Sequence, residues 1–252
     1  MLKLCIVYEA DADWRIGYDL ADRVVVDCID WLREQPDLLR FQREWTKDYA
    51  GIQFRWDAID DLGRDMDLRI RGGYAEGEKD YPDFKAAVRA IRVLRNLFDD
   101  LDAIILIRDT DDQPDRINGL NQAKARFDNK PAGFCILVGA ARTKRECWVL
   151  TGFLPKDKVE VGLLQEARQR LGFDPTTRSH ELTAKNNENE DTRSAKRVLR
   201  QLTQGDAIRE EECWTHTPLA LLKTKGETNG LAAYLNQVEE VLVPMVRGHK
   251  PG

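Results

Sequence analysis

The sequence predicts an α/β fold in which helices flank a mainly parallel sheet. Two observations lead to this class. Short apolar runs, typical of strands buried on both faces, lie at Leu2–Tyr8, Ala103–Ile107 and Phe134–Ala140. Segments with apolar residues spaced three or four apart, the spacing of amphipathic helices, separate these runs. The order strand, helix, strand, helix, strand implies right-handed crossovers between parallel strands.

The helices between these strands follow from apolar spacing and from the prolines. Trp14–Gln35 carries one apolar face, and the proline after it ends the helix. Pro82–Phe98 is the second predicted helix, with its proline in the first turn. Gln113–Asn129 is the third. Ile52–Trp56 alternates in polarity and is predicted to be an edge strand, whereas Arg64–Asp80 is polar and glycine-containing and is predicted to be a loop.

The last hundred residues are predicted to form a helical lobe. A polar, turn-rich stretch at 174–192 interrupts the helical patterns and is expected to be a loop. We therefore expect an α/β domain at 1–150 and a helical C-terminal lobe at 151–252 packed on it. The predicted helices of the lobe are Lys158–Leu171, Ala195–Leu202, Pro218–Lys223 and Ala232–Val243.

Composition narrows the classes of function. The net charge of −5 argues against a protein that passively coats nucleic acid, although not against an enzyme that contacts a few phosphates. The five cysteines are scattered without a CxxC pair, which is typical of reduced thiols in a cytoplasmic protein. No secretory signal is recognisable, and no apolar stretch approaches the roughly 20 residues of a membrane span.

Two acidic clusters follow two of the predicted strands. Glu9 to Asp13 comes after the first apolar run, and Asp109 to Asp112 comes after the second. Carboxylates placed close together disfavour one another's ionisation, and a hard cation such as Mg²⁺ (or Mn²⁺) relieves this repulsion. Ligands of open parallel sheets also bind beyond the carboxyl ends of the strands. The clusters therefore predict a metal site and phosphoryl chemistry.

Individual roles follow from position within each cluster. Glu9 is a candidate ligand or general base, and Asp109 and Asp111, two apart on an extended segment, are expected to point to the same side. Asp13 or Asp112 would complete the ligand set. The alternative is that both clusters are ordinary loop ends, where Asp is favoured as a turn former and helix cap.

The two clusters resemble the motifs of the Toprim fold of topoisomerases, primases and OLD-type nucleases. The matching segments are Ile6–Asp13 and Ile105–Asp111, and the resemblance covers about residues 1–150. It implies that Glu9 is the acid/base and a metal ligand and that the two aspartates of the second motif are metal ligands. It also implies that Asp13 is the second acid of OLD-like members. Ala10 replaces the usual Gly, and the long separation of the clusters implies an insertion around 36–80.

A further acid follows the third predicted strand. In small Toprim-like proteins associated with bacterial genome defence, a Glu followed by a Trp stands in a place similar to that of Glu146 and Trp148. Glu146 is therefore a candidate additional ligand. The alternative is a glutamate at the start of a helix beside a core tryptophan.

These features lead to one main hypothesis and two alternatives. The main hypothesis is a Mg²⁺-dependent Toprim-like nuclease acting on DNA or RNA, an effector of anti-phage defence. The first alternative is a non-catalytic Toprim-like subunit that docks on a larger ATPase or defence complex. The second is a HAD-like phosphohydrolase, since that family also uses Asp-x-Asp. A basic stretch either contacts phosphates or forms a solvated helix face; its members are Lys185, Arg193, Lys196, Arg197 and Arg200.

Overall fold

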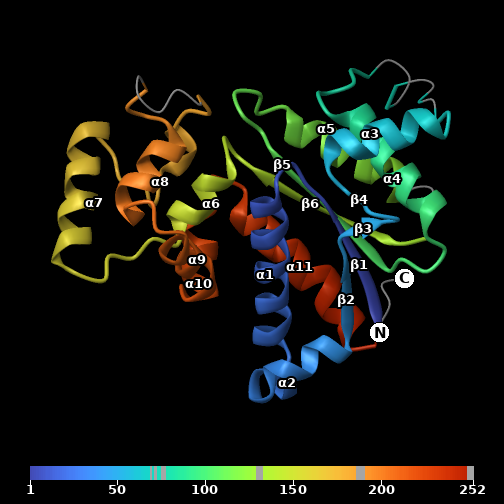
Figure 1. The fold of residues 1–252 in the computed structure, drawn as a ribbon, viewed down its shortest axis with the longest axis horizontal. Coiled ribbons are helices and arrows are strands. Elements are labelled where there is room, and N and C mark those ends of the chain that lie inside the picture. The colour runs from blue at the N-terminus through green and yellow to red at the C-terminus, as the bar shows by residue number, and fades with distance from the viewer. Residues whose placement is uncertain (69, 71–72, 75–77, 129–132, 186–190, 249–252) are drawn as a thin grey trace. The chain divides into compact units, whose positions relative to one another are not determined.

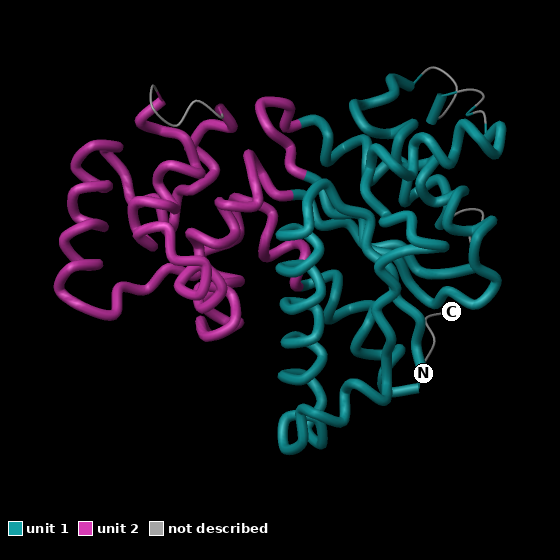
Figure 2. Tube along the Cα trace, in the orientation of Figure 1, with its two compact units in different colours: residues 1–108, 115–140, 236–252 teal, residues 109–114, 141–235 magenta. Residues whose placement is uncertain are grey.

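The computed structural model describes residues 1–68, 70, 73–74, 78–128, 133–185 and 191–248. The chain forms two compact units (Figure 2). Unit 1 consists of Met1–Arg108, Asp115–Ala140 and Asn236–Gly252, and unit 2 consists of Asp109–Pro114 and Ala141–Leu235. None of the helices in the described ranges combines the length and the apolar character needed to cross a lipid bilayer.

A parallel four-stranded sheet forms the centre of unit 1, which confirms the predicted α/β class (Figure 1). The strand order is β2-β1-β5-β6, so the first and second apolar runs of the sequence are central neighbours. Leu4 pairs with Ala103 across these two strands, and both strands are almost wholly buried because their residues are apolar on both faces. The strands are β1 (Leu2–Val7), β2 (Arg43–Thr46), β5 (Ala103–Asp109) and β6 (Cys135–Ala141).

Helices make up most of the rest of both units. In unit 1 they are α1 (Asp11–Cys28), α2 (Asp30–Glu34), the 3₁₀ helix η1 (Pro36–Phe41), α3 (Trp56–Asp65), α4 (Phe84–Leu97), α5 (Arg116–Asp128) and most of α11 (Leu231–Val246), with a small antiparallel pair of β3 (Asp48–Tyr49) and β4 (Ile52–Gln53). In unit 2 they are α6 (Arg145–Thr151), α7 (Lys158–Leu171), the 3₁₀ helix η2 (Ser179–Glu181), α8 (Ala195–Thr203), α9 (Ala207–Thr215) and α10 (Leu219–Lys225).

Three sequence predictions require correction. The single helix Trp14–Gln35 is wrong, because Ile29 is extended (φ −120°, ψ 111°) and separates α1 from α2 while its side chain is buried. The edge strand Ile52–Trp56 is right only for Ile52–Gln53, which form β4 of the small antiparallel pair, because Trp56 starts α3 and the edges of the main sheet are β2 and β6. The predicted loop begins too early, because Arg64 still belongs to α3.

Parts of two predicted loops cannot be compared with the structure. Within Arg64–Asp80, residues 69, 71–72 and 75–77 lie outside the described residues, and these include two glycines of its glycine-rich segment. Within 174–192, residues 186–190 also lie outside them, whereas η2 occupies part of the remainder.

A glutamine side chain closes the outer edge of β6. The amide of Gln237, on α11, accepts a hydrogen bond from the Val138 N–H and donates one to the Val138 carbonyl, both at 3.1 Å. Lys124 also donates to the oxygen of this amide at 3.2 Å. The side chain thus satisfies backbone groups that an edge strand would otherwise expose.

Candidate functional site

Glu9 emerges from the carboxyl end of β1 on backbone that α3 holds in place. The residue before it, Tyr8, donates its N–H to the Phe54 carbonyl at 3.2 Å and accepts from the Trp56 N–H at 3.0 Å. These bonds tie the exit of the strand to the start of α3. The Glu9 side chain is 47% exposed, and its Oε2 lies 3.4 Å from Nη1 of Arg108. The Glu9 carboxylate is therefore accessible to solvent and is paired with the positive charge of Arg108.

Arg108, the partner of Glu9, is held from several directions. Its Nε donates to Oδ2 of Asp83 at 3.1 Å, and its guanidinium carbon lies 5.3 Å from the centre of the Trp56 ring. Only 18% of the Arg108 side chain is exposed. The Trp56 indole N–H donates to the Ile107 carbonyl at 2.7 Å, which fixes the ring beside the strand. Arg108 is thus a positioned cation at the end of β5.

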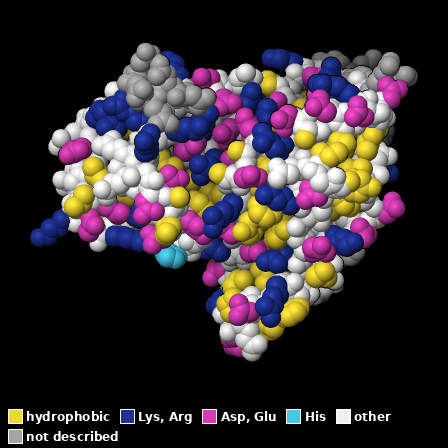
Figure 3. All heavy atoms as spheres, viewed as in Figure 1, with side chains coloured by type: hydrophobic (Ala, Val, Ile, Leu, Met, Phe, Trp, Pro, Cys, Tyr) yellow, Lys and Arg dark blue, Asp and Glu magenta, His cyan; other side chains and the backbone are white. Residues whose placement is uncertain are grey.

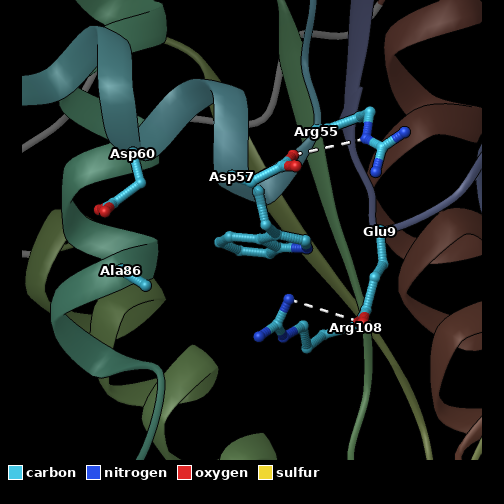
Figure 4. Close-up of a pocket in the computed structure, with 7 residues that line it drawn as sticks. Glu9, Arg55, Asp57, Asp60, Ala86 and Arg108 are labelled. Carbon is cyan, nitrogen blue, oxygen red and sulfur yellow. Dashed lines mark ion pairs between the residues drawn. The ribbon is translucent and has the colours of Figure 1, made fainter.

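A pocket of about 440 Å³ opens around these groups (Figure 4). Figure 4 shows Arg55 and Asp57 at one side of the pocket and Arg108 at the other, with Glu9 reaching toward Arg108. Arg55 and Asp57 form their own ion pair, with Nε and Oδ1 3.4 Å apart. The pocket therefore combines cations, carboxylates and an aromatic ring; its lining residues are Glu9, Arg55, Trp56, Asp57, Asp60, Ala86 and Arg108.

The other predicted acid of the first cluster has a structural role. Asp13 is 5% exposed, and its carboxylate accepts the Ala10 N–H at 2.7 Å at the start of α1. Asp11, which is not a predicted ligand, lies on the surface with its Oδ1 3.2 Å from Nζ of Lys47. Asp13 thus stabilises the helix start, as expected of an acid near a helix N-terminus, and its role as a metal ligand stays a prediction.

The second cluster lies in unit 2, where it contacts the start of α6. Asp109 Oδ1 accepts the Arg145 N–H at 2.8 Å, and Asp111 Oδ1 lies 3.5 Å from Nζ of Lys144. The two carboxylates therefore face consecutive residues. The sequence argument that Asp109 and Asp111 lie on an extended segment was wrong, because Asp111 is in the left-handed region (φ 48°). Asp112 follows in the turn and is exposed.

The loops after β5 and β6 are joined by three hydrogen bonds within unit 2. Thr110 donates its N–H to the Ala141 carbonyl at 2.9 Å, and its hydroxyl accepts the Thr143 N–H at 2.9 Å. Asp111 donates its N–H to the Thr143 carbonyl at 2.8 Å. Thr143 is buried and also left-handed (φ 74°), an uncommon state for a β-branched residue. Strained backbone of this kind is concentrated at functional sites.

Glu146 lies in the first turn of α6 and is 6% exposed. Its Oε1 lies 3.4 Å from Nη2 of Arg145. Burial raises the pKa of the neighbouring Cys147 thiol to about 12, and the negative charges of Glu146 and Asp109 contribute to this shift. The structure thus places Asp109, Asp111 and Glu146 around the start of α6.

Several residues of these surroundings were not found from sequence. Burial raises the pKa of Glu210 on α9; Arg145 opposes that shift and Glu146 reinforces it. The local sequence around Glu210 is an acidic run with the appearance of a solvated helix face. No sequence pattern predicted that Arg55 and Trp56 line the pocket, because only the tertiary structure brings them beside Glu9 and Arg108. Arg108 did carry a signal, because it follows five buried apolar residues.

The donor atoms of the predicted ligands are all carboxylate oxygens, which is the chemistry that Mg²⁺ requires. Among the residues that the structure describes, no three His, Cys, Asp or Glu side chains are grouped as a metal site. Glu9 belongs to unit 1 whereas Asp109 and Asp111 belong to unit 2, so the convergence of the two clusters stays a prediction.

Comparisons with known proteins add no assignment to this geometry. No family model, no curated protein and no solved structure matches the chain.

Proposed function

We propose that this chain is a Toprim-type nuclease that hydrolyses phosphodiester bonds of DNA or RNA with Mg²⁺ or Mn²⁺. The observation that carries the proposal is the pocket at the carboxyl end of β1, where the accessible carboxylate of Glu9 pairs with Arg108 and Arg55 lines the same cavity. In open parallel sheets, ligands bind beyond the carboxyl ends of the strands. A cavity with a few convergent polar groups is the usual form of such a site.

The metal would be held by Glu9, Asp109 and Asp111, where it would polarise the phosphate and generate hydroxide from a bound water. Within unit 1, Glu9 is positioned to accept a proton from the attacking water as a general base. Arg108 and Arg55 are positioned to donate charge-assisted hydrogen bonds to phosphate oxygens. The hydrogen bond from Arg108 to Asp83 keeps the guanidinium in place when Glu9 engages another group. Arg108 then stabilises negative charge that develops on the phosphate.

The test is cleavage of plasmid DNA, tRNA and single-stranded DNA with Mg²⁺, with Mn²⁺ and with a chelator. We expect Glu9→Gln and Asp109→Asn to lower cleavage by about 100-fold or more, the usual contribution of a general acid–base group. Asp11→Asn is the matched control, because Asp11 lies in the same acidic cluster and pairs with Lys47 on the surface. We expect its cleavage rate to equal that of the wild type.

A second readout separates metal binding from turnover. A ligand that binds only the folded state raises the melting temperature, and at 100 times its dissociation constant it adds about 2.7 kcal/mol of stability. We expect Mg²⁺ to raise the melting temperature of the wild type and of Asp11→Asn, but not that of Glu9→Gln. The proposal fails if the wild type cleaves none of the three substrates, or if Glu9→Gln cleaves at the wild-type rate.

A non-catalytic subunit that docks on a larger ATPase is the second candidate. Its supporting observation is a set of exposed apolar side chains around the Arg209–Glu160 ion pair of unit 2. Arg209 also donates to the Leu154 carbonyl, which places one of these residues beside the pair. This candidate predicts that Glu9→Gln leaves co-purification of the partner unchanged. The exposed side chains are those of Leu154, Val159, Val161 and Ile208.

A further inference from the structure

The solvent-facing side of α8 carries only basic and neutral polar side chains. The helix is strongly amphipathic, and its apolar residues Val198, Leu199 and Leu202 are buried. On the other side Lys196 and Arg200 are exposed and Arg197 is half-buried. The sequence of α8, AKRVLRQLT, contains no Asp or Glu. In a chain with a net charge of −5, such a face is a local concentration of positive charge.

Two arginines outside α8 extend this positive surface. Arg170, on α7, donates through Nη1 to the side-chain oxygen of Gln201 at 2.6 Å. Burial lowers the pKa of Arg170, and the positive charge of Arg197 lowers it further, so these two guanidinium groups lie near each other. Arg193, which precedes the helix, is exposed and lies over the Phe173 ring with its guanidinium carbon 5.3 Å from the ring centre.

We define the basic face as the set of five cations on and beside α8. Figure 3 shows Lys and Arg side chains gathered over the α7 and α8 part of unit 2. Among the described residues, at least three acids lie within electrostatic range of this set. Glu166 raises the pKa of Arg170, and the charge of Arg193 adds to larger effects that lower the pKa of Glu181, chiefly the hydrogen bond from Arg178, and of Asp191, chiefly the hydrogen bond from Thr183. The members of the basic face are Arg170, Arg193, Lys196, Arg197 and Arg200.

We propose that the basic face binds the phosphodiester backbone of a nucleic acid. Four of its five cations are arginines, whose planar guanidinium groups match phosphate oxygens in a bidentate way. A helix of the length of α8 is about 14 Å long, so it spans about three or four phosphates at 3.4 Å each. None of the exposed large apolar side chains of the described chain belongs to α8, whereas a membrane-binding helix would expose them.

This inference rests on the proposed function for the choice of ligand, and it adds a contact surface remote in sequence from the candidate catalytic acids. Contacts of this kind hold and orient a nucleic acid without reading its sequence. The basic face would therefore affect affinity and its salt dependence, but not the preference for particular bases.

The test is equilibrium binding of fluorescein-labelled single-stranded DNA, single-stranded RNA and duplex DNA, measured by anisotropy in a chelator over a range of salt concentrations. The variant combines Lys196→Gln, Arg197→Gln and Arg200→Gln. The matched control changes three exposed cations elsewhere, and its substitutions are Arg40→Gln, Arg95→Gln and Lys158→Gln. Circular dichroism and thermal melting confirm that both triple variants remain folded; if the α8 variant does not, each single substitution is measured instead.

We expect the α8 variant to bind at least tenfold more weakly than the control. Each phosphate contact contributes about 0.7 to the slope of log affinity against log salt for a single strand, so we expect the slope to fall by about 2. Equal affinities and slopes for the two variants overturn the inference, and so does a wild type that binds none of the three ligands. It is also overturned if the α8 variant loses binding only to vesicles with anionic lipid.

The chelator keeps this outcome distinct from that of the proposed function. A wild type that binds through the basic face but never cleaves sustains the inference and contradicts the nuclease. A wild type that cleaves, while both triple variants bind alike, contradicts the inference alone.

Discussion

The ion pair between Glu160 and Arg209 makes a strong prediction for the stability of unit 2. Arg209 donates through Nε to Oε1 at 2.6 Å and through Nη2 to Oε2 at 3.0 Å, and Nη2 also donates to the Leu154 carbonyl at 2.8 Å. The two side chains are only 10% and 8% exposed. Arg209→Met removes these three hydrogen bonds together with the longer one from Nη1 to the Cys213 sulfur, and it leaves the Glu160 carboxylate without its buried cation. Breaking a buried pair in this way costs about 3–5 kcal/mol.

Thermal melting measures this cost. For a chain of about this size, each kcal/mol lowers the melting temperature by roughly 2–4 °C, so we expect a loss of about 6–20 °C. The control is Arg168→Met, whose pair with Asp174 is 47% and 25% exposed and should contribute less than about 1 kcal/mol. The double variant Glu160→Met with Arg209→Met should be more stable than Arg209→Met alone, because it leaves no unpaired buried charge.

The same pair gives a pH dependence with a defined sign. The hydrogen bonds from Arg209 hold the pKa of Glu160 below its ordinary value of 4.5. A carboxylate whose pKa is lowered by folding stabilises the folded state above the unfolded value, and this stability is lost as the pH falls through the folded value. We therefore expect the difference in stability between the wild type and Arg209→Met to shrink below about pH 4.5. A difference below 1 kcal/mol at pH 7, or one that grows on acidification, would refute the reasoning.

Two further predictions concern packing and thiol chemistry in the same chain. A Cβ at Gly152 would lie 1.8 Å from the Cys213 carbonyl oxygen, so Gly152→Ala should lower the melting temperature sharply. A Cβ at Gly162, in α7, meets nothing within 4 Å, so Gly162→Ala should raise the stability by up to about 1 kcal/mol. Equal shifts in melting temperature for the two variants would contradict this. Burial raises the pKa of Cys147 and of Cys213 to about 12, so at pH 8 iodoacetamide should modify the partly exposed Cys28 and Cys135 first. Mass spectrometry detects the order of labelling. Labelling of Cys147 before unfolding would contradict the described core.

Local sequence patterns were sufficient to predict the helices and strands that have one clear hydrophobic periodicity. The central strands β1 and β5 are mostly apolar runs, and α7 has the predicted bounds Lys158–Leu171, with Asp157 and Gly172 as its caps in the structure. Helix α6 confirms the alternative reading of Glu146, because Glu146 lies in its first turn and Trp148 is buried beside it. Its extent was not predicted, because residues 146–151 are all buried and leave no polar face to reveal a helical period. The break at Ile29 was missed because a buried isoleucine fits the apolar pattern of a continuous helix equally well.

The candidate site was predictable only where it depends on strand ends. Glu9 and Asp109 were identified because each lies at the carboxyl end of a buried apolar run. The contact of Arg108 with Trp56 joins residues that are 52 positions apart, so it requires the tertiary structure. The ion pairs of the acids also depend on the fold, since no sequence pattern pairs Asp111 with Lys144.

The hydrogen bonds that join the loop after β5 to the loop after β6 have a mechanical consequence for unit 2. Because Thr110 and Asp111 are bonded to Thr143, whatever pulls on the Asp111 backbone also displaces the residues that open α6. Glu146 follows Thr143 by three residues on the same stretch of backbone, so the loops after both strands and the start of α6 form one hydrogen-bonded unit.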